Sequence, residues 1–153
     1  MSDEKKSPED IVKSLENELS KSRQYWTELI HGLSEKIRGD LRQCTSLEAE
    51  SISRQQELNE EIAKWSYKIY NDNARLKVLQ KNKFEWYSTQ YQIKHNSTEK
   101  SKLIEADLAW YTAKIEVLEN YVEYLIETRK TMDHVIWSVK NKIQLYNITG
   151  MDG

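Results

Sequence analysis

The sequence has few residues that interrupt helices, with one proline and four glycines among 153 residues. A chain this poor in helix breakers can form long helices. The single cysteine, Cys44, excludes a disulfide framework and favours an intracellular compartment. Long apolar runs are missing, and the charged first ten residues do not resemble a signal peptide. We therefore expect a soluble, intracellular, all-α protein with no membrane-spanning segment.

Residues that could form a catalytic or metal site are also scarce. The three histidines, His31, His95 and His134, are far apart and have no cysteine or acidic residue at ligand spacing. The sequence has no glycine-rich phosphate loop and no recognisable base that would activate the Cys44 thiol. We therefore expect no enzymatic activity, no metal and no cofactor.

The apolar residues that are present recur at steps of three and four, which is typical of amphipathic helices. The run Ser7–Asp10 has the composition of a helix start, with serine as the cap, proline next and acids in the first turn. Gly39-Asp40 is the expected end of this first helix. A second helix is expected to begin between Thr45 and Leu47 and to end near His95.

A third helix is expected from the capping-box pair Asn96 and Glu99 to Gly150. Its apolar seam keeps the heptad rhythm over six heptads, which predicts a C-terminal coiled coil that mediates self-association. The fold class is thus a helical hairpin or bundle with a C-terminal oligomerisation helix, and its helices can pack within one chain or between chains. The predicted oligomerisation residues are Leu108, Tyr111, Ile115, Leu118, Val122, Leu125, Met132, Ile136, Val139 and Ile143.

Charge is unevenly distributed, although the net charge of the chain is only −2. Residues 64–95 hold seven basic and two acidic residues, a net charge of +5, and aromatic residues alternate with the basic ones. Single-stranded nucleic acid is bound by cations that contact phosphates and by rings on which bases stack. The alternative is an ordinary amphipathic helix with solvated lysines, in which Trp65 and Trp86 belong to the core. The predicted DNA-binding residues are Lys64, Lys68, Arg75, Lys77, Lys81, Lys83, Trp86 and Tyr87.

These patterns divide the chain into three segments. Residues 1–45 form an acidic helical segment without an assigned role. Residues 46–96 form the basic and aromatic helix that we expect to bind single-stranded DNA. Residues 97–153 form the coiled-coil oligomerisation helix.

Three stretches carry a resemblance to a known family. Lys81–Tyr87 has two basic residues flanking one position, then an apolar residue, an acid and two aromatics. Leu103–Leu125 is rich in acids and tyrosine, and Trp137–Asn141 places an aromatic residue before an aliphatic one and a lysine. With these stretches, residues 46–150 resemble the UvsY family of recombination mediators of T4-like bacteriophages. The chain departs from the family at Val135, where an arginine is usual.

The resemblance implies a protein that binds single-stranded DNA and forms a ring, a heptamer in the family, through its C-terminal helices. It also implies that the protein promotes loading of a RecA-like recombinase onto strand covered by single-strand-binding protein, in the cytoplasm of an infected bacterium. By position, Lys81 and Lys83 match the family's DNA-contacting basic pair. The alternative function is a structural or adaptor coiled coil without DNA binding, which does not explain the localised charge of +5.

Overall fold

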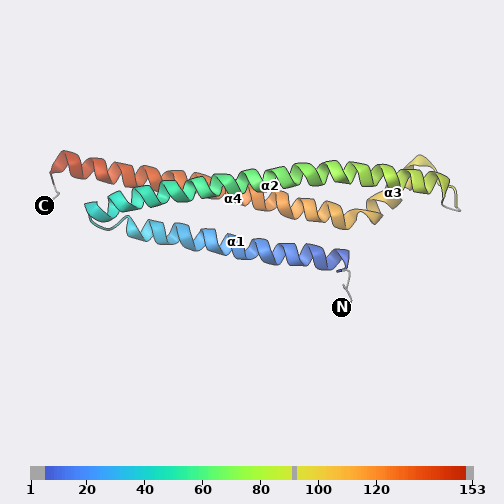
Figure 1. The fold of residues 1–153 in the computed structure, drawn as a ribbon, viewed down its shortest axis with the longest axis horizontal. Coiled ribbons are helices and arrows are strands. Elements are labelled where there is room, and N and C mark those ends of the chain that lie inside the picture. The colour runs from blue at the N-terminus through green and yellow to red at the C-terminus, as the bar shows by residue number, and fades with distance from the viewer. Residues whose placement is uncertain (1–5, 91–92, 151–153) are drawn as a thin grey trace. The chain divides into compact units, whose positions relative to one another are not determined.

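The computed structural model describes residues 6–90 and 93–150, and this part of the chain contains four helices and no strand (Figure 1). The all-α prediction is therefore confirmed. The helices are α1 (Pro8–Lys36), α2 (Leu41–Thr89), α3 (Ser97–Asp107) and α4 (Ala109–Thr149).

Local capping interactions set the start of α1 and of α2. The Ser7 Oγ accepts a hydrogen bond from the Asp10 backbone N–H at 3.2 Å, so the predicted N-cap is confirmed. The predicted start of the second helix at 45–47 is wrong, because the Asp40 carboxylate accepts a hydrogen bond from the Gln43 N–H at 2.9 Å and caps the helix earlier. α2 also ends at Thr89, before the predicted end near residue 95.

The capping box at the start of α3 is confirmed. The Asn96 Oδ1 accepts from the Glu99 N–H at 2.8 Å, and the Glu99 Oε2 accepts from the Asn96 N–H at 3.1 Å. The prediction of one continuous third helix is wrong, because the chain breaks at Leu108, whose φ of −106° and ψ of 8° lie outside the α-helical region. Gly150 follows α4 with a φ of 65°, as expected of a glycine that ends a helix.

The helices are shared between two compact units. Unit 1 comprises Met1–Glu18 and Trp65–Asn120, and unit 2 comprises Leu19–Lys64 and Tyr121–Gly153. Unit 1 therefore contains all of α3 together with parts of the other three helices. Unit 2 contains the remaining parts of α1, α2 and α4.

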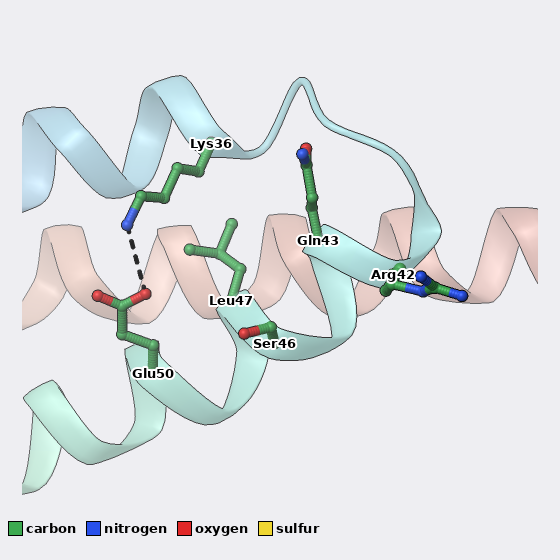
Figure 2. A pocket seen from close by; sticks show the side chains of 6 residues that line it. All are labelled: Lys36, Arg42, Gln43, Ser46, Leu47 and Glu50. Atoms are coloured by element: carbon green, nitrogen blue, oxygen red, sulfur yellow. Dashed lines mark ion pairs between the residues drawn. The ribbon is translucent and has the colours of Figure 1, made fainter.

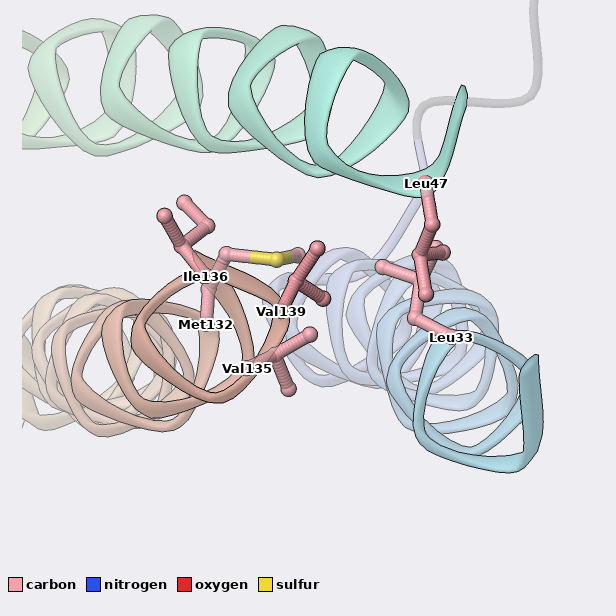
Figure 3. Close-up of a cluster of buried hydrophobic side chains, with 6 residues drawn as sticks. All are labelled: Leu33, Leu47, Met132, Val135, Ile136 and Val139. Carbon is pink, nitrogen blue, oxygen red and sulfur yellow. The ribbon is translucent and has the colours of Figure 1, made fainter. Parts of the chain in front are cut away.

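Unit 2 has an apolar core to which α1, α2 and α4 all contribute (Figure 3). Its buried members are Leu33, Leu47, Met132, Val135, Ile136 and Val139. Val135, the position at which the resembled family usually has arginine, is thus a core residue here. Since burying an unpaired guanidinium is costly, an apolar residue suits this environment.

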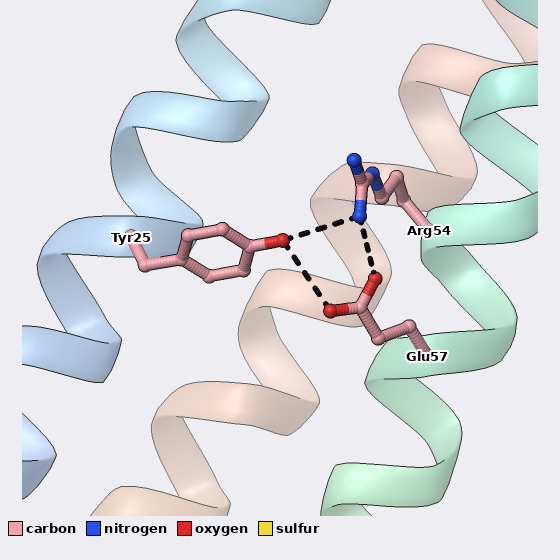
Figure 4. A network of polar contacts seen from close by, with 3 residues as sticks. All are labelled: Tyr25, Arg54 and Glu57. Carbon is pink, nitrogen blue, oxygen red and sulfur yellow. Dashed lines mark hydrogen bonds and ion pairs between the residues drawn. The ribbon is translucent and has the colours of Figure 1, made fainter.

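Polar contacts fasten α1 to α2 within unit 2 (Figure 4). The Arg54 Nη1 lies 2.8 Å from the Glu57 Oε2 and donates to the Tyr25 hydroxyl at 3.3 Å. The Tyr25 hydroxyl in turn donates to the Glu57 Oε1 at 3.3 Å. Burial raises the pKa of Tyr25, and the Glu57 carboxylate adds to the rise.

Unit 1 is held by a smaller core in which α2 meets α3. Tyr87, Ile104 and Leu108 are buried there, and Leu76 and Leu79 pack against them. Figure 1 shows α3 beside the C-terminal part of α2. The packing of Ile104 and Leu108 against Tyr87 of α2 explains the break between α3 and α4. It holds α3 against α2, so the chain changes direction at Leu108 before α4 begins.

The predicted oligomerisation residues are largely enclosed by the chain itself. Eight are buried, and Val122 and Ile143 are half-buried. Packing inside one chain therefore already accounts for the apolar seam of α4. Self-association through these side chains stays a prediction.

Candidate nucleic-acid interface

The candidate interface is the exposed surface of α2 in unit 1, outside the apolar stripe. The stripe recurs every three or four residues and turns Trp65, Asp72 and Tyr87 inward. The remaining surface of α2 presents exposed side chains, which together we call the basic-aromatic face. Its cations are Lys68, Arg75, Lys77 and Lys81, and its rings are Tyr67, Tyr70, Phe84 and Trp86.

Within this part of α2, few acidic groups offset these cations. Residues 65–90 are all described by the structure, and Glu85 is the one exposed acid among them. The second acid, Asp72, is buried and lies 3.6 Å from the Lys114 Nζ on α4, measured from Oδ2. Its Oδ1 accepts a hydrogen bond from the Tyr111 hydroxyl at 3.2 Å. Burial raises the pKa of Tyr111, and the neighbouring Asp72 carboxylate raises it further.

Six of the eight predicted DNA-binding residues are exposed. Lys64 is exposed at the end of the α2 segment that belongs to unit 2, and Trp86 is 40% exposed rather than part of the core. Tyr87 is only 7% exposed, because its hydroxyl donates to the Asp107 Oδ2 at 2.6 Å and its ring joins the core of unit 1. Tyr87 is therefore not part of the basic-aromatic face, contrary to the prediction.

Lys83 differs from the exposed lysines. It lies eighteen residues, or five helical turns, after the buried Trp65, so it leaves α2 on the inward side. Its Nζ is 3.6 Å from the Asp107 Oδ2 and 5.8 Å from the centroid of the Trp86 ring. A phosphate must therefore compete with a carboxylate for Lys83. Lys81 makes no ion pair within the described part of the chain.

Helical period divides the basic-aromatic face into two flanks, because successive residues are rotated by about 100°. The first flank holds Tyr70, Lys77, Lys81 and Phe84. The second flank, on nearly the opposite side of the helix, holds Lys68, Arg75 and Trp86, and Tyr67 lies between the two flanks. A strand that runs along α2 follows one flank, and it reaches both only by wrapping around the helix.

Sequence reasoning missed a contribution from α3 to the first flank. The Lys100 Nζ lies 5.3 Å from the centroid of the Phe84 ring and donates to the Ser88 Oγ at 3.2 Å. Lys100 lies outside the basic window of residues 64–95, and only the return of α3 along α2 brings it there. Beside it is a groove of about 510 Å³ between α2, α3 and the start of α4.

A second pocket, of about 380 Å³, lies in unit 2 where α1 meets α2 (Figure 2). Lys36 and Glu50 form an ion pair across it at 3.5 Å, with Arg42 and Gln43 on its rim. Because a carboxylate already pairs with one of its two cations, the pocket is a weaker anion site than the basic-aromatic face.

The described residues contain no group of three or more histidine, cysteine, aspartate or glutamate side chains that could hold a metal ion. None of the helices within residues 6–90 and 93–150 has both the length and the apolar character needed to cross a membrane. Comparisons of the chain with protein-family models, with curated proteins and with solved structures found no match.

Proposed function

We propose that this chain is a recombination mediator that binds single-stranded DNA through the basic-aromatic face of α2. It promotes loading of a RecA-like recombinase onto strand covered by single-strand-binding protein. The DNA-binding part is carried by the composition of the exposed surface of α2 in unit 1. Four cations and four aromatic rings are exposed there, together with one acid. On the first flank, two cations (Lys77 and Lys81) stand among two rings (Tyr70 and Phe84), which is the combination that sequence-tolerant single-strand binding uses.

The mediator part of the proposal rests on the resemblance of residues 46–150 to the UvsY family. It includes a homo-oligomeric ring, with a C-terminal coiled-coil helix, in the cytoplasm of an infected bacterium. A ring presents the same face many times to one strand, so modest affinity at each subunit adds up through effective concentration.

The exposed end of α4 supports a protein partner. Trp137, Leu145 and Ile148 are large apolar side chains that remain exposed in unit 2. They can contact another copy or the recombinase. An adaptor without DNA binding also accounts for them, but it leaves the composition of the basic-aromatic face unexplained.

The test is fluorescence anisotropy of a labelled single-stranded oligonucleotide, compared with duplex of the same length, at low and moderate salt. We expect binding that prefers the single strand and weakens steeply with salt. Lys21→Ala removes an exposed cation of α1 and is the matched control, with affinity expected to be unchanged. Absence of binding at low salt would contradict the proposal and favour the adaptor.

The loading step has its own assay. The DNA-dependent ATPase of a RecA-like recombinase, measured on strand covered by single-strand-binding protein, should increase when the chain is added. DNA binding without stimulation of the ATPase would support the DNA-binding interface but contradict the proposed mediator role.

A further inference from the structure

We propose that the groove between α2, α3 and the start of α4 in unit 1 takes one nucleobase of the bound strand, stacked on Phe84. This inference rests on the proposed function and adds a base-binding subsite to it. Its volume of about 510 Å³ lies within the range of about 300–1,000 Å³ typical of small-molecule sites.

The groove has an apolar floor and an exposed ring at its wall. Ile104 and Leu108 line it and are buried, whereas Phe84 is 46% exposed. An aromatic ring in this position offers a flat apolar surface to a base, and every base has a π-face that can stack on it. The hydrophobic part of the site therefore suits any nucleobase.

Cations stand on two helices beside this ring. Lys81 of α2 lines the groove, and the Lys100 Nζ of α3 lies over the Phe84 ring, 5.3 Å from its centroid, so a base stacks on the ring face that Lys100 leaves open. A base stacked on the ring thus places its flanking phosphates within reach of positive charge from either helix. This charge complementarity favours a nucleotide over an apolar peptide as the occupant.

Polar side chains at the rim match the edge of a base. Gln80 and Thr112 can each donate and accept, while the Glu105 carboxylate accepts only. An acceptor-only group suits the exocyclic amino group of cytosine or adenine, whereas thymine offers only an N3–H between two carbonyl oxygens that a carboxylate repels. We therefore expect the subsite to prefer cytosine and adenine to thymine.

The experiment compares a short single strand with one of equal length and phosphate number whose sugars carry no bases. Wild-type chain should bind the base-containing strand about tenfold more tightly, because each base stacked on an aromatic ring contributes at this level. Phe84→Ala and Phe84→Leu should both reduce this preference, since leucine keeps apolar volume but has no π-face. Trp137→Leu removes an exposed ring of α4 outside the basic-aromatic face and should keep the preference.

The outcomes separate this inference from the proposed function. Binding of both strands with equal affinity by wild type, or an undiminished preference in Phe84→Ala, would overturn the base subsite and leave DNA binding standing. Failure to bind either strand would overturn both. Circular dichroism checks the fold of each variant. Glu105→Gln, a change of an exposed residue, gives an independent readout. It should reduce the preference for oligo-dC over oligo-dT. An unchanged preference would contradict the proposed contact between the Glu105 carboxylate and the base.

Discussion

Replacing Lys81 with alanine should weaken binding of single-stranded DNA more than replacing Lys83. The Lys81 side chain is exposed and unpaired within the described residues, and it stands beside Lys77 on the first flank. Lys83 is half-buried, and its ammonium group lies 3.6 Å from the Asp107 carboxylate. A phosphate gains less from Lys83 because it must displace that carboxylate first. The two lysines that the resemblance pairs are therefore not equivalent.

The size of the difference follows from counterion release. Each phosphate neutralised on a single strand contributes about −0.7 to the slope of log affinity against log salt. The first flank offers Lys77, Lys81 and Lys100, so one subunit should show a slope of about −2. Lys81→Ala should reduce the slope to about −1.4, which is about a fivefold loss of affinity at roughly 0.1 M salt. Lys83→Ala should leave the slope near its wild-type value.

Anisotropy titrations at several salt concentrations measure these slopes, and the exposed Lys21→Ala variant supplies the baseline for loss of one cation elsewhere. A slope that falls as much for Lys83→Ala as for Lys81→Ala would refute the reasoning. It would mean that DNA binding separates Lys83 from Asp107 at little cost, so that the ion pair does not discriminate between the two lysines.

Three further predictions concern charge, packing and ionisation. Asp107→Asn keeps an acceptor for the Tyr87 hydroxyl but frees the lysine that pairs with Asp107. The slope of log affinity against log salt should therefore steepen by about 0.7. An unchanged slope would contradict the competition between phosphate and the Asp107 carboxylate. Leu118→Ala, at a fully buried residue, should lower the free energy of unfolding, measured by urea titration, by about 2–5 kcal/mol. Leu145→Ala, at a 55% exposed residue, should change it by less than about 0.5 kcal/mol. Equal losses in the two variants would contradict the burial of Leu118. Burial raises the pKa of Tyr121 to about 12, so the contribution of its protonated hydroxyl to stability should be complete below pH 10 and disappear as the pH rises towards 12. Phenolate absorbance, with Tyr121→Phe as the reference, should show this late titration. Ionisation of Tyr121 at the ordinary value near 10 would refute the prediction.

The sequence predicted the helices well where local chemistry decides them. Ser7 and the pair Asn96 and Glu99 cap helices as expected, because these hydrogen bonds involve neighbours along the chain. The break at Leu108 could not be predicted, since no glycine or proline marks it. The break depends on contacts between α3 and α2, which join residues that are distant in sequence. One of these contacts is the hydrogen bond from the Tyr87 hydroxyl to Asp107.

Periodicity also left one ambiguity that only packing resolves. From Lys83 the next inward position of α2 can come after three residues, at Trp86, or after four, at Tyr87. Both steps fit a helical seam, but Trp86 is 40% exposed and Tyr87 is 7% exposed. The acceptor supplied by Asp107 decides in favour of the tyrosine, and the tryptophan ring is left on the outer side of α2. The exposed basic segment was thus predictable in composition, whereas its geometry and the contribution of Lys100 were not.

Self-association can be tested against the burial of the α4 seam. An interface through that seam requires α4 to exchange its own partner helices for those of another copy, because Ile115 is already only 4% exposed. Trp137 and Ile148 are 66% and 73% exposed, and their separation of eleven residues places them on one face, three turns apart. Association without unfolding should therefore use this face.

Ile148→Glu should accordingly lower the mass measured by light scattering while circular dichroism stays unchanged. Ile115→Glu should unfold the chain, because it places an unpaired carboxylate in the core of unit 1. If Ile115→Glu instead gave folded single subunits, and Ile148→Glu kept the wild-type mass, α4 would have to be packed against other copies. The seam would then hold the assembly together, as the heptad pattern alone predicts, and the intrachain contacts of α4 would be those of a swapped helix.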